Sequence, residues 1–302
     1  MNARTWAAAA AIAFATLMPA PALAQQDWAK VEIKIEKLAG STYMLTGAGG
    51  NLGVSVGDDA VLIVDDQFAP LAPRIQAAIA TLSKQPVRFV LNTHWHYDHT
   101  GGNEALGKGG AAIVAHANVR RRMSADQVIQ FVGSSTAVKA SPKAALPVVT
   151  FTSDVAFHVN GEDVQVFHVP AAHTDGDAIV HFRQSKVVHM GDVYFNRLYP
   201  FIDASSGGTL DGVIAACDRV LALVDDETKI IPGHGPLASK ADLKAYRDML
   251  ATIGDRLKAQ AGRKLEEVIA SKPTAEFDAV WGGGFLPPDR FVTMLWGMMP
   301  KR

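Results

Sequence analysis

The chain has 302 residues, of which 48% are hydrophobic, so it can bury a large core. Its formal net charge is only −1, which gives no electrostatic basis for binding nucleic acid or an anionic membrane surface. The single cysteine, Cys217, excludes an intrachain disulfide and leaves the redox compartment open.

The N-terminal segment has the pattern of a cleavable export signal. Arg4 provides a positive start, residues 6–18 are apolar, and Ala22-Leu23-Ala24 has the small residues of a cleavage site. Two prolines interrupt the apolar run before it reaches the roughly 20 residues of a membrane-spanning helix. We therefore expect a signal peptide over residues 1–24, and a mature chain that is periplasmic or secreted and has no membrane partner.

The segment after the leader is expected to consist of β-strands and tight turns. Residues 30–37 alternate in polarity, residues 42–46 form a short strand, and residues 60–64 are a continuous apolar run. Residues 47–53 are rich in glycine but lack the Gly-Lys-Ser/Thr ending of a phosphate-binding loop. A flexible hairpin turn is the better interpretation of that stretch.

Six consecutive residues carry much of the chemical information. After a predicted helix at 71–82 and a buried strand at 87–91, the chain reads His94-Trp95-His96-Tyr97-Asp98-His99. Three of the chain's 10 histidines fall here, which argues against a chance polar loop. Neutral imidazole and carboxylate are the ligands that Zn²⁺ takes when thiolate is absent. In an extended backbone His94 and His96 point the same way, because side-chain direction repeats every two residues.

The remaining pattern alternates strands with helices. Residues 124–147 are weakly periodic, and we expect one or two short helices there. The other expected elements are strands at 111–114, 164–169, 178–182, 186–189 and 229–231, helices at 117–123 and 210–224, and a helical tail from 241 that is broken at Pro273 and 282–284. This order predicts two α/β halves packed sheet against sheet in a single domain, residues 25–302. Cys217 lies on an apolar helical stripe, as a small buried hydrophobe does.

Three further metal-ligand candidates each close a predicted strand. His173 follows the strand at 164–169, Asp192 follows the one at 186–189, and His234 follows the one at 229–231. A glycine beside Asp192 and another beside His234 let the backbone turn sharply or approach closely. Each candidate alone is weak, because single strand-end histidines are usually solvated or hydrogen bonded.

Together these motifs resemble the metallo-β-lactamase superfamily over residues 31–236. The shared features, in order, are Asp65-Asp66, His94-x-His96-x-Asp98-His99, His173, Asp192 and His234. The resemblance implies an α/β fold, the four-layer αβ/βα sandwich, with a metal site at one edge of two packed sheets. It also implies two Zn²⁺ ions, one held by His94, His96 and His173, the other by Asp98, His99 and His234, with Asp192 bridging them. Three protein ligands per zinc leave a position for water.

The resemblance also assigns supporting roles. Asp65 or Asp66 is expected to accept an imidazole N–H and so fix the orientation of a ligand. The seven ligands fill two sites, so we interpret the other five histidines as structural: His116, His158, His168, His181 and His189.

The expected mechanism is hydrolysis by a hydroxide shared between two zinc ions, which attacks a carbonyl carbon of a small-molecule substrate. Asp98 is expected to be catalytic as well as a ligand, because it is placed to orient that hydroxide and relay a proton. Neither a Ser-His-Asp grouping nor an activated cysteine is evident, so we expect no acyl-enzyme.

The substrate is less constrained than the metal site. β-Lactamase-like amide hydrolysis ranks first, because the leader sends the chain to the periplasm, where β-lactams arrive. One large lactamase group, however, has cysteine where Asp192 stands and lysine where Phe195 stands. The bridging aspartate is typical of thioester, lactone and phosphoester hydrolases. A thioesterase resembling hydroxyacylglutathione hydrolase, or a lactonase, is the alternative. An iron-dependent oxidoreductase and a catalytically silent binding module are more distant alternatives for the function.

Family analogy also suggests substrate contacts. Tyr194, Asn196 and Tyr199 follow the strand that ends at Asp192, and with residues 124–147 they are expected to line the cleft. Arg197 is a candidate cation for a substrate carboxylate. A surface salt bridge from Arg197 to Asp203 or Asp211 is an equal alternative.

Overall fold

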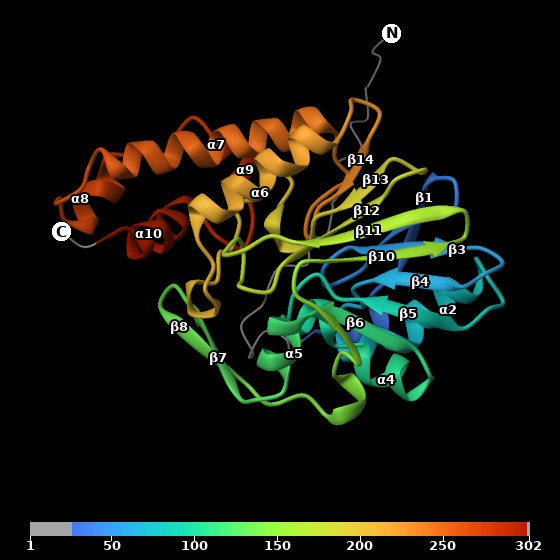
Figure 1. The fold of residues 1–302 in the computed structure, drawn as a ribbon. Coiled ribbons are helices and arrows are strands. Elements are labelled where there is room, and N and C mark those ends of the chain that lie inside the picture. The colour runs from blue at the N-terminus through green and yellow to red at the C-terminus, as the bar shows by residue number, and fades with distance from the viewer. Residues whose placement is uncertain (1–25, 301–302) are drawn as a thin grey trace, which may run out of the picture.

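Two β-sheets lie face to face in the computed structural model, which describes residues 26–300 (Figure 1). The predicted signal peptide, residues 1–24, lies outside the described residues. The first sheet has the strand order β1-β2-β3-β4-β5-β6-β9, with bounds Lys34–Ala39, Thr42–Thr46, Leu52–Val56, Val61–Val64, Val87–Leu91, Ala112–His116 and Val149–Phe151. The pairs from β1 to β4 are antiparallel, and those from β4 through β5 and β6 to β9 are parallel.

The second sheet contains five strands. Its order is β10-β11-β12-β13-β14, with bounds Asp154–Val159, Glu162–His168, Ala178–Phe182, Val187–His189 and Lys229–Ile231. Only the pair β13 and β14 is parallel. The carboxyl ends of β5, β13 and β14 are followed by three of the predicted ligand segments, so the sheet connections determine where the site forms.

Alternating strand side chains build two different cores on either side of the first sheet. In β4, Leu62 and Val64 pack between the two sheets, while Val61 and Ile63 pack on the outer side of the first sheet. Successive side chains of a strand face opposite sides. A strand buried on both sides therefore reads as the continuous apolar run seen at residues 60–64.

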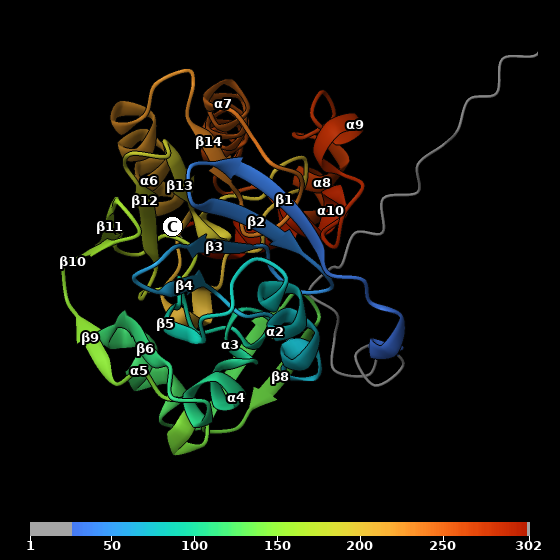
Figure 2. The ribbon, with the colours of Figure 1, turned by 90° about the vertical axis from the view of Figure 1, so that its right-hand side faces the viewer.

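Helices cover the outer face of each sheet (Figure 2). α2 (Ala72–Ala80) and α4 (Asn103–Lys108) pack on the first sheet, and α6 (Leu210–Leu223) and α7 (Lys240–Lys258) pack on the second. This order of helix, sheet, sheet and helix is the four-layer αβ/βα sandwich expected from the sequence. The remaining helices are α3 (Tyr97–Thr100), α5 (Ala117–Met123), α8 (Leu265–Ala270), α9 (Asp278–Trp281) and α10 (Pro288–Met298), with 3₁₀ turns η1 (Trp28–Lys30), η2 (Ala69–Leu71), η3 (Lys143–Ala145), η4 (Gly191–Val193) and η5 (Ala204–Ser206).

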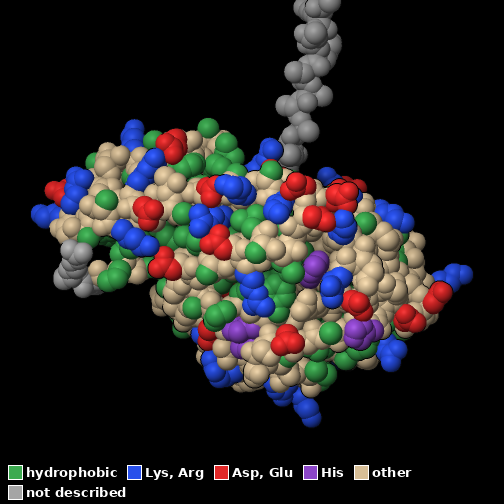
Figure 3. Space-filling model, turned by 45° about the horizontal axis from the view of Figure 1, so that its top comes forward, with side chains coloured by type: hydrophobic (Ala, Val, Ile, Leu, Met, Phe, Trp, Pro, Cys, Tyr) green, Lys and Arg blue, Asp and Glu red, His purple; other side chains and the backbone are tan. Residues whose placement is uncertain are grey.

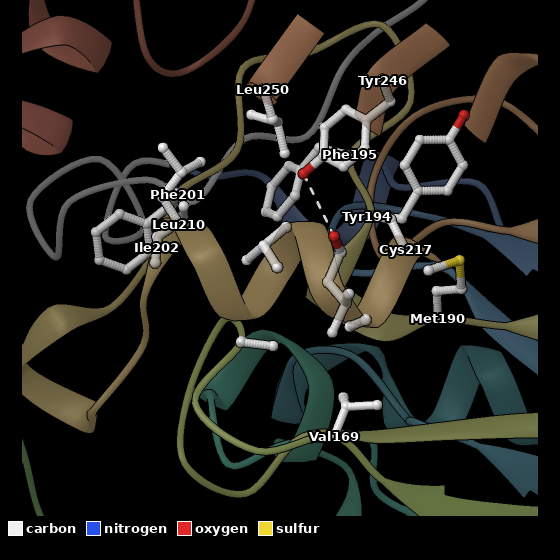
Figure 4. Close-up of a cluster of buried hydrophobic side chains, with 14 of the residues drawn as sticks. Val169, Met190, Tyr194, Phe195, Phe201, Ile202, Leu210, Cys217, Tyr246 and Leu250 are labelled. Atoms are coloured by element: carbon white, nitrogen blue, oxygen red, sulfur yellow. Dashed lines mark hydrogen bonds between the residues drawn. The ribbon is translucent and has the colours of Figure 1, made fainter. Parts of the chain in front are cut away.

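The largest core lies between the second sheet and the C-terminal helices (Figure 4). Cys217 is fully buried there on α6, and burial raises the pKa of its thiol, so the prediction of a small buried hydrophobe is confirmed. The expected breaks of the helical tail are also present, because Pro273 and residues 282–284 fall between helices. None of the helices within residues 26–300 has both the length and the apolar character needed to cross a bilayer.

The expectation of short helices in residues 124–147 is wrong. Apart from the 3₁₀ turn η3, the segment forms a β-hairpin, β7 (Gln127–Phe131) and β8 (Ser134–Val138), which pairs with neither sheet (Figure 1). Only Ile129 of the two strands is fully buried, so the alternation that reveals a strand in a sequence is weak here. Gly133 provides the positive φ of 78° in the two-residue turn.

Lys and Arg side chains are interspersed with Asp and Glu on the face shown in Figure 3. No single-sign patch dominates that face, in keeping with the net charge of −1.

Candidate metal centre

All seven predicted ligands meet where strands of both sheets end. They follow β5 (His94, His96, Asp98, His99), β11 (His173), β13 (Asp192) and β14 (His234). Their potential ligand atoms form two groups, each with atoms within 4.8 Å of one another: His94, His96, His173 and Asp192 in one, Asp98, His99 and His234 in the other. We call His94, His96 and His173 the imidazole group, and Asp98, His99 and His234 the mixed group.

The imidazole group directs one nitrogen of each ring toward a common centre. His173 Nε2 lies 3.0 Å from His96 Nδ1 and 3.7 Å from Asp192 Oδ2. His94 Nε2 lies 3.9 Å from the same Asp192 oxygen and has no hydrogen-bond partner. These three nitrogens and one carboxylate oxygen therefore converge on a space that a cation could fill.

The outer nitrogens of these rings are held by the protein. His96 Nε2 donates to Asp203 Oδ2 at 3.0 Å, and His173 Nδ1 donates to the Phe201 carbonyl at 2.8 Å. His94 Nδ1 lies 3.0 Å from the Thr93 hydroxyl, which itself donates to Asp65. Metal-binding histidines typically place their second N–H on such acceptors, which fixes the tautomer and the ring orientation. The arrangement leaves the inner nitrogens available as ligands.

The mixed group is linked to Asp192 and to Asp65. His99 Nε2 lies 3.0 Å from Asp192 Oδ1, and His234 Nε2 lies 3.3 Å from Asp98 Oδ2. His99 Nδ1 donates to Asp65 Oδ2 at 2.7 Å, so the prediction that Asp65 orients a ligand is confirmed. Asp66 has a different role, because it accepts the Gly102 backbone N–H at 2.8 Å.

The two carboxylates of the cluster are buried without hydrogen bonds. Asp98 is 0% exposed and Asp192 is 2% exposed, and none of their four oxygens has a hydrogen-bond partner. Burying a carboxylate is costly unless a cation or donors compensate it. Four orphaned oxygens beside inward-facing imidazole nitrogens are the donor set that Zn²⁺ and similar divalent metals bind. The residues therefore fit a metal centre.

The electrostatics of the two groups differ. Burial and neighbouring imidazoles hold the pKa of His94 well below its usual value, and burial lowers that of His173 to about 4. Burial acts in the same direction on His99 and His234, but the surrounding carboxylates outweigh it. They raise the pKa of His99 well above its usual value and that of His234 to about 9.

Two glycines allow the backbone to approach the ligands. A Cβ on Gly50 would lie 2.0 Å from the His99 ring, and one on Gly233 would lie 2.0 Å from Asp192 Oδ1. Residues 47–51 connect β2 to β3 in a turn, as predicted, and Gly49 and Gly50 of this turn lie against the ligands. The Gly50 N–H donates to the Asp98 carbonyl at 3.1 Å. Close packing against the ligands accounts for Gly49 and Gly50.

Two of the predicted substrate contacts are wrong. Tyr194 is 0% exposed and packs on Tyr246 in the helical core, on the outer side of the second sheet (Figure 4). Tyr199 is 2% exposed, and its hydroxyl donates to Asp278 at 2.8 Å. Asp192 lies within the 3₁₀ turn η4, and Tyr194 is the first residue after it.

The residues next to these tyrosines in the sequence have other surroundings. Asn196 is buried and donates to the Pro236 carbonyl, and Phe195 stacks on His234 with ring centroids 5.1 Å apart. Arg197 is exposed and forms no ion pair within the described part of the chain. The proposed salt bridge is wrong, since Asp203 binds His96 and Asp211 pairs with Lys258 instead. Arg197 as a substrate cation stays a prediction.

The other five histidines lie outside both ligand groups. His189 donates from Nε2 to the Asn51 carbonyl and accepts the Gly191 N–H, and His116 stacks on His168 with centroids 3.9 Å apart. His158 pairs with Asp163 at the surface. His181 lies on β12.

Sequence reasoning did not identify Asp203 and Phe201 as supports of the ligands. Asp203 also accepts the Ser206 backbone N–H in a local cap, and this Asp-x-x-Ser pattern is the only sequence signal of its ordered side chain. Its contact with His96 spans 107 residues of chain, which no local pattern reveals.

Comparison with known proteins decides the family. Residues 46–237 match the model of the metallo-β-lactamase superfamily. The chain belongs to this superfamily. It is thus a member of a superfamily of metal-binding hydrolases, and the centre described above lies at the place that the sequence resemblance assigned to the metal.

Relatives and solved structures vary in their named activities. The chain is 26% identical over 195 residues to a hydroxyacylglutathione hydrolase of a Polaromonas species, a match covering 62% of this chain and 66% of that protein. It spans about half to two thirds of the length of the curated relatives it matches. A metallo-β-lactamase from Pontibacter korlensis has a TM-score of 0.60 at 19% identity, covering 73% of this chain and 99% of its own. The sec-alkylsulfatase Pisa1 from a Pseudomonas species has a TM-score of 0.65 at 19% identity, covering 89% and 50%. These two structural matches show a shared fold.

Proposed function

We propose that this protein is a dinuclear zinc hydrolase that uses water to break the bond between a carbonyl carbon and its leaving group in a small-molecule substrate. The observation that carries the proposal is the set of four unpartnered oxygens of Asp98 and Asp192 facing the inner nitrogens of the histidines. The imidazole group would hold one ion and the mixed group the other, with Asp192 between them. Export to the periplasm rests on residues 1–24 alone.

When bound, two such ions would lower the pKa of water to about 7 and polarise a carbonyl oxygen. The chain's own residues then have separate tasks. Asp65 and Asp203 keep His99 and His96 in one orientation through hydrogen bonds of 2.7 and 3.0 Å. Asp98 Oδ1 has no hydrogen-bond partner, and it is the atom that orients the attacking water and accepts its proton for transfer to the leaving group.

Thioesters or lactones are the substrate class that we favour. Curated relatives over this region are named hydroxyacylglutathione hydrolase. Within the described residues, no lysine or arginine forms an ion pair or hydrogen bond with the seven ligands, and Phe195 stands where a carboxylate-binding lysine occurs in one lactamase group. A carbonyl substrate without an anionic group beside the scissile bond suits this environment better than a β-lactam drug.

β-Lactam hydrolysis is the second candidate. The observation in its favour is Arg197, an exposed cation two residues after Phe195 that forms no ion pair within residues 26–300. It would have to bind the carboxylate of the drug. An iron-dependent oxidoreductase remains the more distant alternative, and metal analysis distinguishes it directly.

The proposal can be tested with one panel of substrates. The purified protein should be assayed on a neutral thioester, a lactone, a penicillin and a phosphodiester, each with and without a chelator. We expect chelator-sensitive turnover of the thioester or lactone that returns when zinc is added. Penicillin turnover alone would favour the second candidate, and rates equal to the chelated control on all four compounds would overturn the proposal.

A further inference from the structure

Trp95 stands between two predicted ligands in the sequence, but its side chain belongs to neither ligand group. The residue is 3% exposed and lies in the core that also contains Val119 and Met123 of α5. Its Nε1–H donates to the Ser206 hydroxyl at 3.1 Å, a contact between segments 111 residues apart. The buried N–H therefore has its partner in η5, the 3₁₀ turn that Asp203 caps.

Ser206 connects this indole to a ligand. Its hydroxyl donates to Asp203 Oδ2 at 2.5 Å, and His96 Nε2 donates to the same oxygen at 3.0 Å. Trp95, Ser206, Asp203 and His96 are each at most 3% exposed, so bulk water does not compete for these partners. We call these four side chains the indole network. Because Trp95 and His96 are consecutive residues, the network closes on the segment from which it starts.

The hydrogen bonds of the indole network can point in only one direction. An indole N–H can only donate, and an ionised carboxylate can only accept. The Ser206 hydroxyl has one hydrogen, so it accepts from Trp95 and donates to Asp203. Asp203 accepts in turn from His96 Nε2, which leaves the lone pair of His96 Nδ1 directed at the metal centre, 3.0 Å from His173 Nε2.

The turn that carries Asp203 and Ser206 also contacts a second ligand. The Asp203 N–H donates to the His173 carbonyl at 3.0 Å, and a Cβ on Gly208 would lie 2.2 Å from that oxygen. The backbone of Asp203 is thus closely constrained, and the main freedom left to its carboxylate is rotation of the side chain. Ser206 restricts that rotation, because its N–H donates to Oδ1 at 3.1 Å while its hydroxyl donates to Oδ2.

We propose that Trp95 and Ser206 are positioning residues, which hold the Asp203 carboxylate so that His96 keeps Nδ1 as its metal-binding atom. The inference rests on the proposed function in taking the imidazole group as a zinc site. Without the Trp95 N–H, the Ser206 hydroxyl is free to turn away from Asp203. Without the hydroxyl, the buried indole N–H is left unpaired and Oδ2 loses a donor. Either change should let the carboxylate rotate and His96 populate its second tautomer.

The first test follows the tautomer of His96 in the metal-free protein by ¹⁵N NMR of labelled histidine. Trp95→Phe removes the N–H and keeps an aromatic ring, and Ser206→Ala removes the hydroxyl. Ser205→Ala is the matched control, because Ser205 lies in the same turn and donates to the same carboxylate, but through Oδ1 and without a bond to Trp95. We expect the Nε2–H tautomer alone in the parent and the control, and a mixture in both variants. A single, unchanged tautomer in either variant would overturn the role of that residue.

The second test measures zinc affinity by competition with a chromogenic chelator. Binding of one of the two zinc ions should weaken by about tenfold in Trp95→Phe and in Ser206→Ala. The double variant should lose no more than the weaker single variant, because both residues act through one carboxylate. Losses that multiply to about a hundredfold would overturn this shared route, as would weaker binding with an unchanged tautomer. Mixed tautomers in a protein that binds no zinc would overturn the proposed function and retain the indole network.

Discussion

The imidazole group consists of three histidine rings, whereas the mixed group pairs two histidines with a carboxylate. In the imidazole group every outer nitrogen has a protein acceptor, and burial keeps the pKa values of His94 and His173 low. In the mixed group the carboxylates raise the pKa values of His99 and His234. The imidazole group is therefore ready for a metal, while the mixed group must first lose protons.

Replacing the shared carboxylate should have the largest effect, because it affects both groups. Asp192→Ala removes the oxygens that lie 3.7 Å from His173 and 3.0 Å from His99. We expect the metal content to fall and turnover to drop by about a thousandfold, the equivalent of several kcal/mol of lost metal assistance. Elemental analysis and steady-state rates measure both. Full metal occupancy in this variant would show that the groups do not depend on Asp192.

Replacing Asp98 tests the mixed group alone. Asp98→Ala should lower turnover by about a hundredfold, because the group that accepts the proton is lost, while the imidazole group keeps its ion. Metal content and rate should be measured on the same sample. Near-normal turnover with full metal would contradict the catalytic role of Asp98.

The two groups also have matched supporting carboxylates. Asp203→Asn weakens the anchor of His96 and Asp65→Asn that of His99, and each should reduce metal affinity or activity by about 10- to 100-fold. Asp211→Asn is the control, since Asp211 is 77% exposed and pairs only with Lys258. Competition with a chromogenic zinc chelator gives the affinities. If metal affinity and activity fall no more than in the control, Asp203 or Asp65 does not orient a ligand in the way we propose.

The pH dependence of metal binding should distinguish the groups. His99 and His234 have raised pKa values, about 9 for His234, so below that pH a metal must displace their protons. Affinity at the mixed group should therefore rise with pH up to about 9, by about tenfold per unit for each displaced proton. His94 and His173 have lowered pKa values, about 4 for His173, so a metal should displace few protons from these two rings above pH 5. Calorimetry in buffers of different ionisation enthalpy counts the protons released when zinc binds. Equal proton release at the imidazole group and the mixed group would contradict the difference that we infer between them.

The smallest effect is expected outside both groups. Arg197→Ala should change thioester kcat/KM by less than about twofold, because Arg197 is exposed and residues 194–196 separate it from the η4 turn. A clear rise in KM for a penicillin, with unchanged thioester kinetics, would instead support the second candidate function.

The candidate ligands could be named from the sequence because they follow strands that local patterns reveal and because the motifs together resemble one superfamily. His94 and His96 follow an apolar strand with the spacing of an extended chain, and Asp192 and His234 follow similar runs. The fold followed from the same runs, since strands buried on both sides appear as continuous apolar segments. Local sequence patterns therefore predict the strands of both sheets and the positions where those strands end.

Other features depend on contacts that are distant in sequence. Asp203 reaches His96 across 107 residues, and only the folded chain shows it. The hairpin of residues 127–138 was missed because just one of its strand residues is fully buried. Tyr194 is close to Asp192 in the sequence, but its side chain packs in the helical core after the η4 turn and not beside the ligands. The seven candidate ligands do lie together in the fold, whereas two of the expected substrate contacts, Tyr194 and Tyr199, are buried elsewhere.

The number of metal ions per chain tests the central claim most directly. The protein should be loaded with zinc, freed of excess metal and analysed by native mass spectrometry together with elemental analysis. Two zinc ions per chain are predicted, one for the imidazole group and one for the mixed group. A single zinc at saturation, or one tightly held iron, would contradict the dinuclear hydrolase.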